Sequence, residues 1–195
     1  MWVLWGSVIS IPLLFVLAFA CVLFFNLFHA HEHCIKQTGA AFRSYATEHD
    51  GKFPADTNGF GNALLLLVKG GYLGDTNGHY GVGPITGPGD DGEVFREALR
   101  TGLRIPEEKC SRVYIQGLSK ANNPRLVILF DKRPTPGSDH FHRPWGPLLR
   151  EVCFLDGSMQ CIQESSWPAF ASNQVELLVQ EGFERAQATH YFHIP

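Results

Sequence analysis

The stretch EVCFLDGSMQCI, residues 151–162, carries the strongest secondary-structure signal in this chain of 195 residues. Two runs of strand-forming residues flank Asp156-Gly157, and this pattern predicts an antiparallel hairpin with a two-residue turn. In such a turn Gly157 takes a positive φ, which glycine adopts without steric cost. A two-residue turn places Cys153 and Cys161 on opposite faces, so we expect no disulfide between them; a three-residue turn would reverse that expectation.

Further elements of both kinds precede and follow the hairpin. Residues 112–116 and 125–130 are rich in β-branched and aromatic residues, which predicts two more strands. Residues 62–72 form an apolar run that ends at two glycines, which predicts a short buried helix. Ser-Ser-Trp-Pro at 165–168 combines a serine cap with a proline in the first turn, so a C-terminal helix is predicted from about residue 166. The predicted fold class is α+β with a small antiparallel sheet.

The first 28 residues predict a membrane-spanning helix. The run from Trp2 to Phe28 contains no Asp, Glu, Lys or Arg. At 1.5 Å per residue the run is about 40 Å long, more than the ~30 Å of a bilayer core. A cleaved signal peptide, a lipoprotein signal ending at Cys21 and a buried core helix fit this run less well. We therefore expect membrane lipid to contact residues 2–28, and one water-facing domain to occupy residues 29–195.

The helix is predicted to continue beyond the membrane. Ile35, Thr38, Phe42 and Tyr45 recur at spacings of three and four, which is one face of a helix. This stripe predicts a helix that runs to about residue 48 and packs its apolar face on the domain. Asp50-Gly51 supplies the stop signal.

Charge and cysteine content bear on the partners, the location and the disulfide bridges that the sequence allows. The chain has 16 Lys+Arg against 19 Asp+Glu, so no basic surplus favours a nucleic-acid partner. Lys36 and Arg43 follow the predicted span, and by the positive-inside rule these two charges weakly favour a cytoplasmic domain. The cysteines outside the span are even in number, which permits disulfide bridges without requiring them. They are Cys34, Cys110, Cys153 and Cys161.

Two segments resemble a known family. Residues 34–54, CIKQTGAAFRSYATEHDGKFP, resemble the segment just past the membrane helix of bacterial type II secretion pseudopilin-like proteins, a kind of type IV pilin-like protein. Residues 151–160 resemble the late hairpin of the same family. The resemblance implies a long N-terminal helix, half in the membrane, packed on a small antiparallel sheet. It also implies an inner-membrane protein with its domain outside the cytoplasm, and structural roles for Gly51, Pro54 and Asp156-Gly157.

The chain departs from the family pattern in three places. Family members carry a short basic leader and a glutamate inside the membrane helix, and neither is found in this sequence. An intramembrane carboxylate is costly and serves subunit docking in that family, so filament assembly is put in question. In a large subgroup a histidine precedes the Asp-Gly turn by nine intervening residues, and Gly146 occupies that position here.

Two groups of histidines are candidate metal ligands. His140 and His142, with Asp131 or Asp156, could form a cation site, and the alternative is an ordinary polar loop beside the hairpin. His29 and His33 are four residues apart and share a helix face, but no third ligand is identifiable. We therefore expect no metal site and no cofactor.

Other catalytic patterns are weak. Oxygen donors in glycine-rich loops suit Ca²⁺ by composition, but no EF-hand pattern follows them, and turn chemistry explains them more simply. No nucleophile elbow, phosphate loop or dinucleotide fingerprint occurs, and the acidic neighbours of Cys110 do not favour a thiolate. The loop residues are Asp56, Asn58, Asp75, Asn77, Asp90 and Asp91.

These observations lead to an expected function that is not enzymatic. The chain is expected to be a membrane-anchored, pseudopilin-like structural or interaction component of the cell envelope, linked to type II secretion. Its expected partners are other pilin-like subunits or secretion components. A membrane-tethered ligand-binding or sensor domain is the first alternative, and a membrane-bound metal-dependent hydrolase is the second.

Overall fold

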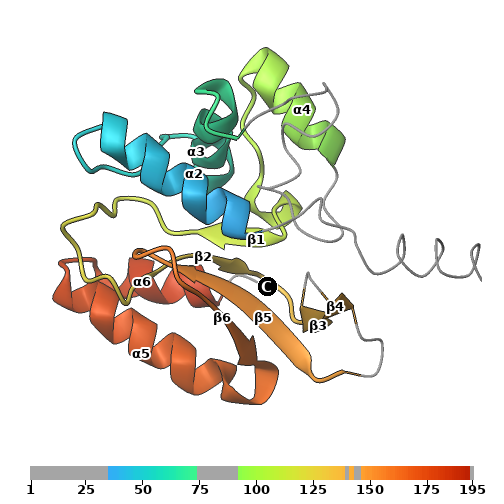
Figure 1. Cartoon of the computed structure of the whole chain (residues 1–195), viewed down its shortest axis with the longest axis vertical. Coiled ribbons are helices and arrows are strands. Elements are labelled where there is room, and N and C mark those ends of the chain that lie inside the picture. Colours follow the sequence, from blue (N-terminus) through green and yellow to red (C-terminus); the bar gives the residue numbers. More distant parts are fainter. Residues whose placement is uncertain (1–34, 74–91, 139–140, 143–145, 194–195) are drawn as a thin grey trace, which may run out of the picture.

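A computed structural model describes residues 35–73, 92–138, 141–142 and 146–193. Within these ranges the fold is α+β, with an antiparallel sheet between two groups of helices (Figure 1). The helices are α2 (Ile35–Glu48), α3 (Phe60–Lys69), α4 (Gly92–Thr101), α5 (Trp167–Gln180) and α6 (Arg185–Phe192), with 3-10 turns η3 (Glu107–Lys109) and η4 (Glu164–Ser166). The strands are β1 (Arg112–Tyr114), β2 (Val127–Asp131), β3 (Thr135–Ser138), β4 (Phe141–His142), β5 (Leu148–Phe154) and β6 (Met159–Gln163).

The sheet is built around β5. Its order is β1-β2-β5-β3-β4, and β6 also pairs with β5 on the side away from β2. All the pairings are antiparallel, and Val152 at the centre of the sheet lies opposite Phe130 on one side and Gln160 on the other. Because side chains alternate along a strand, each strand contributes to both faces. Both faces are covered by helices, so β1 and β2 are buried at every position.

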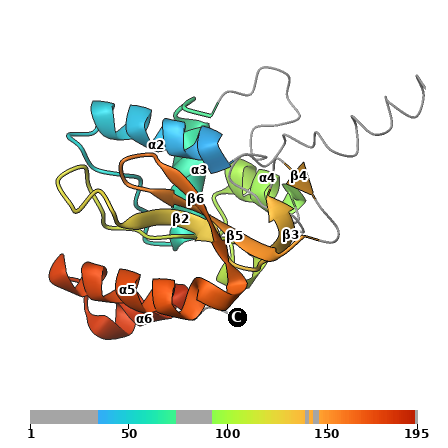
Figure 2. The same cartoon turned by 60° about the horizontal axis from the view of Figure 1, so that its bottom comes forward.

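One helical group lies on each face of the sheet. Figure 2 shows α2 on one side of the sheet, and α5 with α6 on the other. On the α2 side Phe42 stacks on Tyr114 with ring centroids 4.9 Å apart. On the opposite side Phe130 stacks on Phe192, with ring centroids 4.9 Å apart, and contacts the tilted ring of Trp167. These aromatic pairs join the two helical groups to the sheet through a continuous core.

Helix α2 ends where the Asp-Gly signal predicts. Asp50 and Gly51 both have positive φ, 52° and 78°, and the Gly51 N–H donates to the Ala46 carbonyl at 2.8 Å. This geometry closes the last turn of the helix. The chain then forms a bridge to the loop before β2, and the Tyr114 hydroxyl donates to the Pro54 carbonyl at 2.7 Å. Gly51 and Pro54, two of the four residues expected to have structural roles, thus fix the exit of α2 against the sheet.

Among the described residues, no helix has the length and apolar character needed to cross a membrane. The longest ones, α2 and α5, have 14 residues, about 21 Å against the ~30 Å of a bilayer core. This finding contradicts the predicted fold class, which included a long membrane-spanning helix, and the predicted single-pass inner-membrane location. The predicted span 2–28 itself, with His29 and His33, lies outside the described residues.

The hairpin loop is one residue longer than predicted. Cys153 pairs with Met159, and the Phe154 N–H donates to the Ser158 carbonyl at 2.9 Å, which leaves residues 155–157 as a three-residue loop. Gly157 has φ 81° at the third position, the geometry of a type I turn closed by a glycine bulge. Asp-Gly suits both turn types, so the sequence alone did not separate them.

The longer loop changes the register but does not create a bridge. Cys153 and Cys161 now share a face, as expected for a three-residue turn. Cys161 lies opposite Glu151, however, and not opposite Cys153. Cys153 is buried and Cys161 is exposed, and neither belongs to a disulfide.

Substitution of Gly157 tests this turn. An added Cβ at Gly157 would lie 1.4 Å from Nη1 of Arg43, in addition to the strain of φ 81°. Gly157→Val should therefore reduce the free energy of unfolding of the full chain by about 1–3 kcal/mol, a loss of several degrees in melting temperature. The control is Gly102→Val, where φ is 73° but nothing lies within 4 Å of the added Cβ. Thermal unfolding of both variants is followed by circular dichroism. An equal loss of melting temperature in the two would show that Arg43 does not contact the turn.

Candidate functional site

Helix α2 and the β5–β6 hairpin meet at a close contact that we call the helix–hairpin junction, formed by Gly39, Arg43, Cys153, Asp156 and Gly157. Gly39 is buried in the middle of α2 and faces β5. A Cβ at this position would lie 2.7 Å from the Cys153 Sγ, which is closer than real Cβ atoms come to their neighbours. Glycine therefore permits the helix to lie directly on the strand.

One turn further along α2, Arg43 reaches the hairpin loop. Its guanidinium occupies the space in which a side chain at Gly157 would lie. Two hydrogen bonds from Ser158 hold the pKa of the Asp156 carboxyl below its usual value, and the Arg43 charge acts in the same direction. Asp156 is therefore ionised at neutral pH, so the loop presents a negative charge close to a positive one from α2.

The thiol within the junction is not a nucleophile at neutral pH. Burial raises the pKa of Cys153 to about 11, although Arg43 acts in the opposite direction. A thiol protonated at neutral pH reacts slowly, because the thiolate is the reactive form. Cys110 is also buried, and its Sγ donates to the Pro106 carbonyl at 3.7 Å. These two cysteines therefore do not favour covalent catalysis.

A buried ion pair lies beside Glu151 in the middle of β5, two residues before Cys153. The Arg112 Nε donates to the Asp131 Oδ1 at 3.2 Å, and the two side chains are 0 % and 5 % exposed. The second carboxylate oxygen of Asp131 accepts from the Glu151 N–H at 3.0 Å. Neighbouring strands supply the three residues, so the pairing of β1, β2 and β5 positions the charges. An ion pair so placed fixes the register of the strands and does not leave Asp131 open to solvent.

The structure separates the two carboxylates that are the alternative partners of His140 and His142. Asp131 is held by Arg112 at the end of β2, and Asp156 lies in the hairpin loop beside the start of β2, about 15 Å away along that strand. His142 is in β4 opposite Gly137, and His140 lies outside the described residues. Within the described ranges no group of three or more His, Cys, Asp or Glu could hold a metal ion.

The glycine-rich loops contain turn contacts where they are described. The Asp56 Oδ1 accepts from the Asn58 N–H at 2.7 Å, a local Asx-turn. The Asp56 N–H in turn donates to the Gln116 side chain at 2.8 Å, which ties this loop to the end of β1. The remaining candidate residues lie outside the described residues: Cys34, Asp75, Asn77, Asp90 and Asp91.

Two grooves beside α5 were missed by the sequence analysis. One lies between α5 and the hairpin and holds about 290 Å³; the other lies between α5 and α6 and holds about 490 Å³. Arginines line both, but in the α5–α6 groove Arg150 and Arg185 are each paired with a glutamate. No sequence pattern indicates these grooves, because their lining residues come from segments far apart in the chain.

Comparisons of the chain with family models, with curated proteins and with solved structures each gave no match.

A double-mutant cycle tests the closest contact of the junction. Gly39→Ala adds a methyl group against the Cys153 sulfur, so overpacking should cost about 1–3 kcal/mol of stability. Cys153→Ala removes the sulfur, and in that background Gly39→Ala should instead stabilise the chain by about 0.5–1 kcal/mol through its helix propensity. Chemical denaturation of the four proteins measures this reversal of sign. A destabilisation by Gly39→Ala that is the same in both backgrounds would rule out the contact.

The buried ion pair makes a second, separate prediction. Asp131→Asn removes the charge of a carboxylate that pairs with the buried Arg112 guanidinium, so the chain should lose about 3–5 kcal/mol of stability. The matched control is Glu176→Gln, which removes the carboxylate from the exposed pair with Arg185 and should cost much less stability. Thermal unfolding compares the two variants. If both shift the melting temperature equally, then Asp131 does not form a buried ion pair.

Proposed function

We propose that this chain is a pseudopilin-like structural or interaction component, which works through contacts with other proteins and not through catalysis. The single observation that carries the proposal is the helix–hairpin junction. Residues 34–54 and 151–160 resemble two segments of pseudopilin-like proteins, and described parts of both segments meet at Gly39 and Cys153. A resemblance that rests on two distant segments gains support when these segments pack against each other.

The arrangement of α2 on the sheet is consistent with this proposal. The apolar stripe of α2 is buried against the sheet, while its other face, which includes Gln37, Ala40 and Ser44, is exposed. Both faces of the sheet are covered by helices, so a partner meets the outer faces of helices or the rims of the sheet. The exposed face of α2 combines small residues with charged ones, and its Arg43 reaches the hairpin loop.

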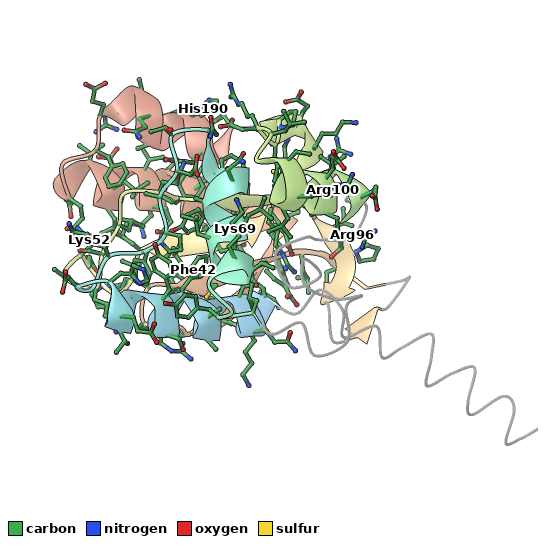
Figure 3. All side chains as sticks on the ribbon, turned by 90° about the horizontal axis from the view of Figure 1, so that it is seen from above. Phe42, Lys52, Lys69, Arg96, Arg100 and His190 are labelled. Carbon is green, nitrogen blue, oxygen red and sulfur yellow. The ribbon has the colours of Figure 1, made fainter. Side chains whose placement is uncertain are left out.

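The charged outer surface of α4 is a less suitable docking face. The labelled residues Arg96 and Arg100 lie on the outside of α4, whereas Phe42 lies in the interior beside α2 (Figure 3). Each of these arginines already pairs with a glutamate one turn earlier in the same helix. Such pairs support the helix and give the surface no net charge with which to attract a partner.

Crosslinking in the source organism tests the proposal. A photoreactive phenylalanine at Ser44, on the exposed face of α2, should crosslink to a pilin-like subunit or a secretion component identified by mass spectrometry. The same amino acid at Gln187, exposed on α6 beyond the opposite face of the sheet, is the control and should not give that product. The proposal fails if Ser44 gives no crosslink, or gives only the same products as Gln187.

A further inference from the structure

The groove between α5 and the hairpin has an apolar floor. Phe154 of β5 and Phe170 of α5 pack edge to face, with ring centroids 6.3 Å apart and planes at 78°. Together with Leu177 these rings are only half-buried, and they line a cavity of about 290 Å³. This volume is at the lower end of the range for ligand pockets, so it suits a small ligand.

Two opposite charges border this floor. Arg125, from the loop before β2, and Asp156, from the hairpin loop, line the same cavity and are both exposed. Among the ion pairs of the described residues, none joins Arg125 to Asp156. Arg43 also acts on Asp156, but from the α2 side of the loop and not from the cavity lining. The groove therefore presents a cation and an anion, and each can pair with an oppositely charged group of a ligand.

Hydrogen bonds hold the walls of the groove in place. Gln174 of α5 is 3 % exposed, and its side chain accepts from the Val127 N–H at 2.9 Å and donates to the Arg125 carbonyl at 3.2 Å. On the other wall the Asp156 N–H donates to the Pro124 carbonyl at 3.4 Å. The backbones that carry both charges are thus fixed to each other and to α5 before any ligand binds, which reduces the entropic cost of binding.

We propose that this groove binds a small zwitterion with an apolar side chain, an α-amino acid of the size of leucine or phenylalanine. The carboxylate of the ligand pairs with the Arg125 guanidinium, and its ammonium group pairs with the Asp156 carboxylate. The apolar side chain lies on the rings of Phe154 and Phe170. A ligand with one charge of each sign satisfies both border residues, whereas a simple anion or cation leaves one of them unmatched. This assignment is independent of the protein contacts proposed above.

The α5–α6 groove is larger but lacks this property. There the Arg150 Nε and Nη2 donate to both oxygens of Glu164 at 2.7 and 2.9 Å, and the guanidinium lies 4.6 Å from the centre of the Trp167 ring. Arg185 is held by Glu176 in the same two-bond manner. A ligand would have to displace these carboxylates, so the smaller groove is the better site.

A titration of the isotope-labelled full chain with L-phenylalanine, followed by NMR, tests the assignment. Resonances of Phe154, Phe170 and Asn173 should shift, with a dissociation constant on the order of 1 mM for so small and open a site. N-acetyl-L-phenylalanine amide, which has the same ring but neither charge, is the matched probe and should bind at least about tenfold more weakly. Equal binding of the two probes, or no shifts with L-phenylalanine up to about 10 mM, would overturn the proposal.

Two variants separate the roles of the charges. Arg125→Gln and Asp156→Asn should each weaken L-phenylalanine binding about tenfold or more, and asparagine keeps the turn chemistry of position 156. Arg185→Gln removes an arginine from the other groove and should leave the dissociation constant unchanged. Unchanged binding in Arg125→Gln, with a melting temperature equal to that of the original chain, would also overturn the proposal. The comparison of the two probes on the unaltered chain decides the question if either variant fails to fold.

Discussion

The contact between Gly39 of α2 and Cys153 of β5 sets the distance between the first described helix and the sheet. At this point the backbone of the helix lies directly over a side chain of the strand, and even one methyl group more would have to displace the sulfur. The same approach brings Phe42 onto Tyr114 and places Arg43 over the hairpin loop. Interiors packed to this density respond to small changes in volume, so the position of α2 depends on a glycine at residue 39.

Two residues before Cys153, β5 is also positioned by a buried ion pair. The Arg112–Asp131 pair is buried between β1 and β2, and Asp131 also accepts a hydrogen bond from the backbone of β5. A buried pair of this kind contributes little net stability compared with apolar residues, but it penalises any register that separates its members. The central strand is thus positioned by close packing at Cys153 and by the ion pair beside Glu151. This leaves the hairpin loop in a defined position relative to α2 and α5.

In this arrangement, contacts with other molecules fall at the edges of the sheet. Helices cover both faces, so the strands contribute mainly to the core. The hairpin loop lies between the exposed face of α2 on one side and the α5 groove on the other. Arg43 acts on Asp156 from the helix side, and Asp156 also borders the groove. Asp156 therefore belongs both to the helix–hairpin junction and to the lining of the groove.

The sequence by itself determined the local elements whose signals are short in range. The Asp-Gly turn, the stop of α2 at Asp50-Gly51 and the start of α5 near Ser166 follow from backbone preferences of a few adjacent residues. The length of the hairpin loop was not determined, because Asp-Gly fits loops of two and of three residues. The short strands β3 and β4 and the helix α6 were also not predicted; β3 pairs with β5 and α6 packs its Phe192 on Phe130, and such contacts have no local sequence signal.

The tertiary structure alone decided which residues meet. The sequence offered Asp131 and Asp156 as alternative partners of His140 and His142 in a cation site. The structure places Asp131 at the end of β2 and Asp156 beside the start of the same strand, so the two carboxylates lie apart. Gly39 opposite Cys153, Arg112 with Asp131, and Arg125 with Asp156 around one groove have no signature in a linear pattern. Each depends on strand register and helix position, which are set by the free energy of packing the whole core and not by any local preference.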